Sequence, residues 1–161
     1  METHHKSTTN SDSMLLATIR NLIQSCFMSH LYSVKTTVAK GCVSSFLALV
    51  PECWADSVCE HLMIGYFDAN QALLGIDTAS SELTAAVILP VRRIVHDALL
   101  CDARNVMLAH NHPGGDPRPS QSDLETTRSI ARIFAILEIR VVDHLIVARR
   151  NMFSFREAGL L

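Results

Sequence analysis

The order of apolar and amphipathic segments in the C-terminal third most strongly constrains the fold of this chain. Residues 106–110, VMLAH, are an apolar run of strand length, and residues 120–137 carry apolar side chains at helical spacing. Two further apolar runs follow at 141–148 and 152–155. Strands that alternate with helices in this way predict an α/β sandwich with a mixed sheet.

The middle of the chain predicts the remaining strands and a second helix. Period-two and β-branched runs indicate strands, and a proline is tolerated in the first turn of a helix. The expected elements are strands at 60–67 and 72–77 joined by a turn at 68–71, a connection at 78–83, a short strand at 84–88, and a helix from Pro90 to about 101.

The N-terminal part has weaker patterns. Residues 1–13 are polar and predict a disordered tail. An amphipathic helix is expected from Leu15, and a short helix near 43–49. We therefore expect three parts: the tail at 1–13, a helical extension at 14–57, and the main domain at 58–161.

Composition and charge exclude several classes of protein. The chain of 161 residues is 48% hydrophobic and 19% charged, which is typical of a globular domain rather than a disordered one. Its net charge of −2 gives no electrostatic footprint for nucleic acid. No apolar run approaches the roughly 20 residues of a membrane span, and the polar start METHHKSTTNSDS is not a signal peptide.

The five cysteines include no C-x-x-C pair. Neither a disulfide framework nor a thiolate zinc site is therefore expected. We predict reduced, mostly buried thiols in a cytoplasmic protein.

Residues 109–123, AHNHPGGDPRPSQSD, are the densest stretch of chemistry. Alternate residues of a strand share a face, so His110 and His112 can direct both imidazoles at one point. Asp123 can complete a site for Zn²⁺ if the loop folds the helix start back against the strand end, leaving a fourth position for water. Glycines in the loop permit the sharp turn.

The same stretch also has a purely structural interpretation. Ser-x-x-Asp before an apolar run is typical of a helix N-terminus, and Ser122 with Glu125 matches a capping box. Histidine pairs also occur in surface loops without a ligand. The residues alone leave both interpretations open.

A family resemblance favours the metal site. The spacing His110-x-His112, seven residues, Ser120, two residues, Asp123 resembles H-x-H-x7-S-x2-D, the zinc motif of JAB/MPN (JAMM) metalloproteases. The segment is most similar to the RadC-like branch, as are LPVRR and RVVDHLIV elsewhere in the chain. The resemblance covers about residues 58–161. It implies the α-β-α sandwich of JAB/MPN domains, which is cytidine-deaminase-like, with a short helical N-terminal extension.

The resemblance also implies roles for individual residues. His110, His112 and Asp123 would bind Zn²⁺, and Ser120 would hydrogen-bond the oxyanion. Glu60, at the start of EHLMIGYFD, fits the upstream glutamate that acts as general base.

Other polar residues fit these roles less well. Glu82 is the rival to Glu60 as general base. His61 is expected on the opposite sheet face from Glu60, His144 as a packed or outer residue rather than a ligand, and His96 on a helix surface.

The implied function is that of a zinc-dependent metallopeptidase or isopeptidase that uses a zinc-activated water. Its substrate would be a protein or peptide, including ubiquitin-like tails. The alternative is a non-hydrolytic JAB-fold module linked to DNA repair or phage defence. A metal-dependent nuclease would favour carboxylate-rich ligation instead.

Two features depart from the family pattern. Gly114 replaces the usual serine after H-N-H-P. Longer RadC-like proteins carry a helical DNA-repair-type domain ahead of this one, and residues 1–57 are too few to form it. A link to DNA is therefore not expected.

Overall fold

A computed structural model describes residues 42–81 and 91–161. Their central element is a five-stranded mixed sheet with strand order β2-β1-β3-β4-β5. Strands β3 and β4 are parallel, and the other neighbouring pairs are antiparallel. The strands are β1 (His61–Phe67), β2 (Leu73–Ser80), β3 (Asn105–Asn111), β4 (Arg140–Ala148) and β5 (Asn151–Ser154).

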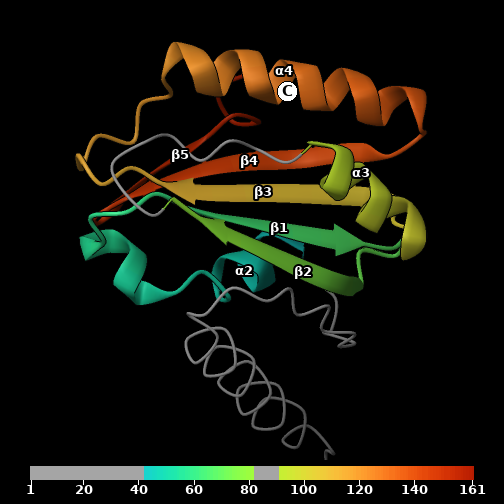
Figure 1. Cartoon of the computed structure of the whole chain (residues 1–161), viewed down its shortest axis with the longest axis horizontal. Coiled ribbons are helices and arrows are strands. Elements are labelled where there is room, and N and C mark those ends of the chain that lie inside the picture. The colour runs from blue at the N-terminus through green and yellow to red at the C-terminus, as the bar shows by residue number, and fades with distance from the viewer. Residues whose placement is uncertain (1–41, 82–90) are drawn as a thin grey trace, which may run out of the picture.

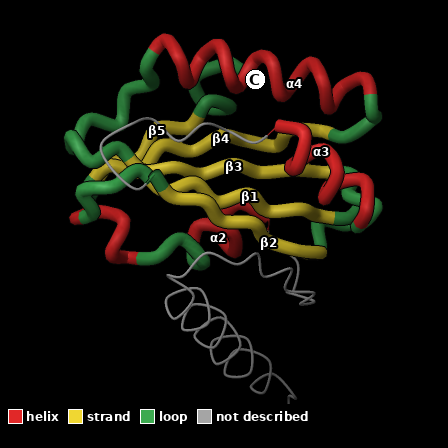
Figure 2. The backbone as a smooth tube through the Cα atoms, viewed as in Figure 1, coloured by secondary structure: helices red, strands yellow, loops and turns green. Residues whose placement is uncertain are grey.

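Helices cover both faces of this sheet, as Figures 1 and 2 show. On one face lie α3 (Val91–Leu100) and α4 (Gln121–Ile136), and on the other lie α2 (Cys42–Leu47) and the 3₁₀ helix η1 (Glu52–Asp56). The protein is therefore an α-β-α sandwich, which confirms the predicted fold class.

The apolar faces of α3 and α4 pack on one side of the strands. Ile94 of α3 and Phe134 of α4 are each 1% exposed and share a core cluster with Leu108 of β3. The predicted apolar face of α4 is confirmed, with Ile130 and Phe134 buried.

The opposite core cluster includes residues that the sequence analysis places in the N-terminal extension. Phe46, Leu49 and Trp54 pack with Met63 and other residues of the sheet. A Cβ at Gly65 of β1 would lie 2.7 Å from the Phe46 ring, so glycine is needed where this ring crosses the strand. Phe46, Leu49 and Trp54 are thus part of the core around the sheet.

The observed elements agree with most of the expected ones and extend some of them. Strand β2 continues to Ser80, because residues 78–80, predicted as a connection, pair with residues 61–63 of β1. The helix near 43–49 is α2, and η1 was not anticipated. The expected tail, the helix from Leu15, the strand at 84–88 and Glu82 lie outside the described residues.

Two expectations about side chains and membranes can also be compared with the structure. Cys53, Cys59 and Cys101 are free thiols, but Cys53 is exposed and the other two are only partly buried, so the expected burial is wrong for these three. Cys53 lies in the short helix η1, and Cys59 and Cys101 lie outside the helices and strands.

Among the described residues, no helix has the length and apolar character needed to cross a membrane.

Candidate metal centre

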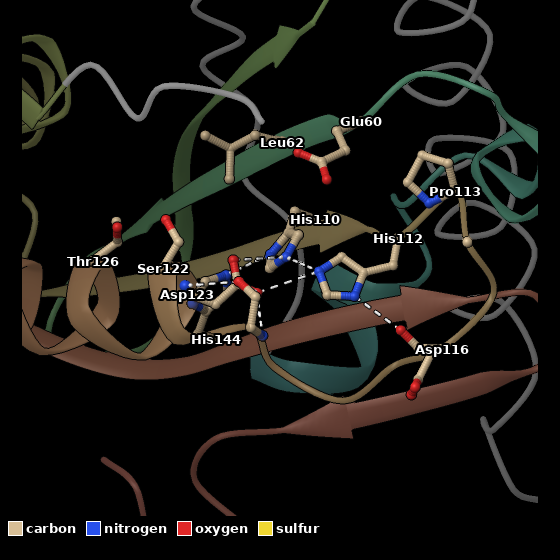
Figure 3. A pocket seen from close by; sticks show the side chains of 12 residues that line it. Glu60, Leu62, His110, His112, Pro113, Asp116, Ser122, Asp123, Thr126 and His144 are labelled. Atoms are coloured by element: carbon tan, nitrogen blue, oxygen red, sulfur yellow. Dashed lines mark hydrogen bonds and ion pairs between the residues drawn. The ribbon is translucent and has the colours of Figure 1, made fainter. Parts of the chain in front are cut away.

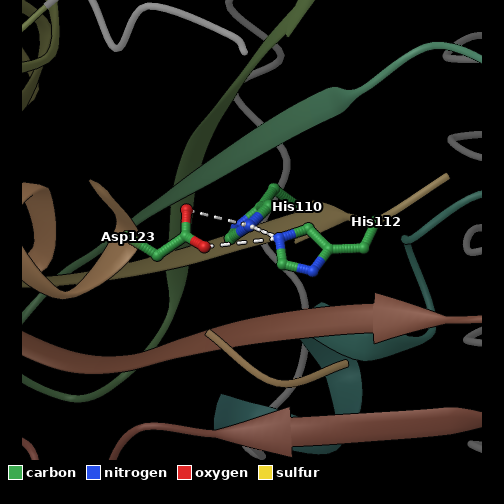
Figure 4. A group of neighbouring side chains, drawn as sticks. All are labelled: His110, His112 and Asp123. Atoms are coloured by element: carbon green, nitrogen blue, oxygen red, sulfur yellow. Dashed lines mark hydrogen bonds and ion pairs between the residues drawn. The ribbon is translucent and has the colours of Figure 1, made fainter. Parts of the chain in front are cut away.

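The C-terminal end of β3 brings two imidazoles to one point. His110 lies in β3 and His112 directly follows it, on the sheet face that α4 covers. The Nε2 atoms of the two rings are 3.0 Å apart (Figure 4). The predicted convergence of these side chains is therefore present.

Asp123 reaches the same point from the first turn of α4. Ser120 is the N-cap of this helix: its hydroxyl oxygen accepts a hydrogen bond from the Asp123 N–H at 3.1 Å, and the Asp123 carboxylate accepts one from the Ser120 N–H at 2.7 Å. The capping box is thus Ser120 with Asp123, and the predicted box of Ser122 with Glu125 is wrong. The helix begins at Gln121, two residues too early for Ser122 to be its N-cap.

The donor atoms of the three side chains lie at distances close to those around a tetrahedral metal ion. Donor atoms held about 2.0–2.1 Å from a tetrahedral Zn²⁺ are about 3.3–3.4 Å from one another. Asp123 Oδ1 lies 3.4 Å from His110 Nε2, Asp123 Oδ2 lies 3.3 Å from His112 Nε2, and the two Nε2 atoms are 3.0 Å apart. His110, His112 and Asp123 are accordingly a group that can hold a metal ion.

A buried chain of hydrogen bonds determines which nitrogen of His110 faces this group. The Thr127 hydroxyl donates its single proton to the Asp123 main-chain oxygen at 2.6 Å, so it can only accept from His144 Nδ1, also at 2.6 Å. His144 Nε2 must then accept from His110 Nδ1 at 2.8 Å. This leaves the lone pair of His110 Nε2 directed at the metal group.

His112 is oriented by the loop instead. Its Nδ1 donates to the main-chain oxygen of Asp116 at 2.9 Å, which leaves Nε2 as the acceptor. Two imidazole lone pairs and one carboxylate therefore converge without a donor between them. Such a set of acceptors is stabilised by a cation, either a proton on one ring or a metal ion.

A metal ligand must be a neutral imidazole or an ionised carboxylate, and the three side chains differ in how strongly their pKa values favour these forms. Burial lowers the pKa of His110 to about 4. Burial opposes ionisation of Asp123, but hydrogen bonds from the protonated form of His112 and from Ser120 outweigh it and lower its pKa. The hydrogen bond with Asp123 raises the pKa of His112, against the effect of burial. His110 and Asp123 are thus ready to ligate near neutral pH, whereas His112 must release a proton more often.

A pocket of about 340 Å³ opens beside the three side chains (Figure 3). Glu60 lies directly before β1 and lines this pocket, and its carboxylate points towards the histidines. The charge of Glu60 contributes to the raised pKa of His112. The structure thus places Glu60 at the pocket, as the sequence analysis expects. Ser122 and Thr126 of α4 also line it.

The remaining residues considered from the sequence lie elsewhere or behind the site. The rings of His61 and Trp54 stack with their centroids 5.4 Å apart on the far side of the sheet. His96 is exposed on α3. His144 is 2% exposed and contacts Nδ1 of His110, not the Nε2 atom that faces the metal group. The hydrogen bonds from His144 to Thr127 and from the His61 N–H to Asn111 were not anticipated. Thr127 lies one helical turn after Asp123, and Asn111 lies between the two histidines.

The fold and the donor group together define a JAB-type α/β domain with a candidate metal centre. The chain belongs to the RadC-like JAB domain family, which matches residues 41–160. This family is compatible with hydrolase activity.

Curated bacterial relatives are similar to 102–108 residues of the chain. It is 38% identical to UPF0758 protein YfjY of Escherichia coli strain K12 over 102 residues, which cover 63% of this chain and 64% of that protein. It is 39% identical to UPF0758 protein BAV2405 of Bordetella avium, covering 63% of this chain and 45% of the relative. It is 40% identical to UPF0758 protein Bpet3149 of Bordetella petrii, and the match covers 66% of this chain and 48% of that relative. The chain thus spans less than two thirds of the length of these curated relatives.

Proposed function

We propose that this protein is a zinc-dependent hydrolase of amide bonds in a protein or peptide substrate, with isopeptide bonds to ubiquitin-like tails as one substrate class. The observation that carries the proposal is the convergence of His110, His112 and Asp123 in one pocket beside the Glu60 carboxylate. Catalysis of hydrolysis needs a Lewis acid and a base at the same point, and this pocket offers groups for both.

The three donor side chains would hold the metal, with His144 and Asp116 orienting the two rings. When bound, Zn²⁺ supplies a Lewis acid that brings the pKa of water towards ~7. The Glu60 carboxylate would accept the proton of the attacking water and pass it to the leaving amine.

Ser120 would stabilise the negative charge that develops on the carbonyl oxygen. Its hydroxyl donates to Asp123 Oδ2 at 2.6 Å in this structure. Rotation about the C–O bond redirects this proton without moving the oxygen, because a hydroxyl hydrogen turns to suit its acceptor. A donor of this kind lowers the barrier only if it reaches the transition state.

Substitution Glu60→Gln tests the proposal. The amide keeps the shape of the side chain but cannot accept a proton, so hydrolysis should fall by at least ~10²-fold while zinc content stays near one ion per chain. The rate would be measured on fluorogenic peptide pools and diubiquitin, with zinc determined by elemental analysis.

Two results would contradict this assignment. Full activity in Glu60→Gln would show that another base, with Glu82 the next candidate, does this work. A wild-type protein that holds zinc but cleaves no substrate would instead favour the non-hydrolytic binding module.

A further inference from the structure

Asn111 lies between His110 and His112 in the sequence, but its side chain points to the opposite face of the sheet and is 0% exposed. Its amide hydrogen-bonds to main-chain groups of the segment before β1 and of His61, the first residue of β1. Its Oδ1 accepts from the main-chain N–H of His61 at 2.6 Å, and its Nδ2 donates to the main-chain oxygens of Cys59 at 3.0 Å and Trp54 at 3.1 Å. One acceptor and both donor protons of the amide are thus in use.

This amide continues the sheet where its backbone pairing stops. The register between β1 and β3 ends at Leu62 opposite His110. One residue further, the side-chain amide of Asn111 takes the place of a peptide group, because it accepts from His61 N–H and donates to Cys59 C=O. Those two groups flank Glu60 in the chain.

The main chain of Glu60 is held from its other side by the end of β2. The Glu60 N–H donates to the Ser81 hydroxyl at 3.2 Å, and the Ser81 N–H donates to the Glu60 carbonyl at 2.9 Å. Glu60 therefore has strand-like restraints on both edges, although β1 itself begins at His61. Asn111 supplies the restraint that comes from the strand bearing the two histidines.

We propose that Asn111 is a positioning residue for Glu60, an inference that rests on the proposed role of Glu60 as general base. The residue between two metal ligands is bonded to both neighbours of the base, so one side chain fixes the base relative to the metal group. Displacement of a reacting group by about 1 Å can cost roughly 10²-fold in rate. A merely structural Asn111 would affect stability but not the turnover of folded molecules.

The test combines Asn111→Ala with Glu60→Gln in a double-mutant cycle on the full chain loaded with zinc. We expect Asn111→Ala to lower kcat on fluorogenic peptide pools by at least ~10-fold, with KM and zinc content unchanged. In the Glu60→Gln background the same change should cause no further loss, because Asn111 acts through Glu60. Independent, multiplying effects would overturn the proposal, as would an unchanged kcat.

Two further variants keep the test decisive. Tyr66→Phe is the matched control. It removes a buried hydrogen bond that Tyr66 of β1 donates to Asp77 of β2, and it should leave kcat unchanged. A loss of kcat in this control as large as that in Asn111→Ala would overturn the proposal. If Asn111→Ala does not fold, Ser81→Ala removes one restraint on Glu60 at a partly exposed position, and about a 3-fold loss that disappears in Glu60→Gln is expected. Full activity of Ser81→Ala in that case would count against the proposal.

Hydrogen exchange separates this inference from the hydrolase proposal, because it needs no substrate. In Asn111→Ala the His61 and Glu60 amides should exchange at least ~10-fold faster, while amides inside β1 such as Ile64 keep their protection. Unchanged protection at His61 would overturn the positioning role even if the wild-type protein is an active hydrolase. Faster local exchange in a protein that cleaves no substrate would support the restraint on Glu60 and reject the proposed function instead.

Discussion

The two histidines of the candidate metal centre differ in what holds them, although one residue separates them. His110 is fixed by a buried chain of side chains, His144 and Thr127. His112 is fixed by one main-chain oxygen of Asp116, in the exposed loop before α4. Their pKa values move in opposite directions, down for His110 and up for His112. The centre thus combines a rigid buried half with an adjustable exposed half, and the exposed half faces the pocket.

The largest effect on zinc binding should come from Asp123, the residue that joins the two halves. Asp123 lies within 3.4 Å of both Nε2 atoms, so Asp123→Ala should weaken zinc binding by more than the ~100-fold typical of an outer residue. Zinc content after dialysis and a competitive zinc titration measure this. Glu125→Ala, which removes a carboxylate from the same helix outside the cluster, is the control. Zinc retention at the wild-type level would make Asp123 a capping residue alone.

Ser120 belongs to the exposed half and has both a structural and a proposed catalytic role. As an N-cap alone, Ser120→Ala would cost about 1 kcal/mol of stability with turnover intact. As an oxyanion donor, it should also lower kcat by ~10²-fold at unchanged zinc content. We expect the second result. Ser120→Asn should restore stability but not kcat, and full kcat in folded Ser120→Ala would refute the catalytic role.

The buried half should respond more moderately to loss of its hydrogen-bond chain. Thr127→Val preserves shape but leaves His144 Nδ1 without its acceptor, so zinc affinity should fall by ~10-fold. The neighbouring Thr126 lines the pocket but is outside this chain of hydrogen bonds, so Thr126→Val should bind zinc as the wild type does. Equal affinities of both variants would show that the rigid half does not depend on these side chains.

The smallest effect is expected in the loop, where two adjacent glycines offer a matched pair. Gly115 has φ +79, and a Cβ there would lie 3.0 Å from the Arg149 side chain, whereas a Cβ at Gly114 meets nothing within 4 Å. Gly115→Ala should lower stability by about 1 kcal/mol and zinc affinity by a few-fold. Gly114→Ala should change neither in thermal melts and zinc titrations. Identical behaviour of the pair would mean that the loop conformation does not matter to the centre.

The elements with long, regular patterns could be predicted from the sequence. The apolar periodicity of α4 and the apolar runs of β3 and β4 indicate both their type and their approximate bounds. The positions of His110, His112 and Asp123 allowed a shared site, since a strand end and the following helix start are close in an α/β unit, but they left the structural interpretation open. The resemblance to the JAB/MPN motif favoured the metal site.

The supporting contacts could not be predicted, because they join residues that are remote in the sequence. The bond from His61 to Asn111 spans 50 positions, and nothing local marks either residue as its partner. The capping box was assigned two residues too late, because Ser120 and Ser122 both have an acidic residue three positions on. Only the observed start of α4 distinguishes these two pairs.

The shared carboxylate of the capping box has a thermodynamic consequence. Asp123 both caps the first turn of α4 and faces the metal group, so a metal ion that binds it binds only the folded arrangement of this helix start. Such a ligand stabilises the native state by RT ln(1 + [L]/Kd), or about 2.7 kcal/mol at a hundredfold excess over Kd. Zinc supply would then shift the folding equilibrium of the domain as well as the occupancy of its centre.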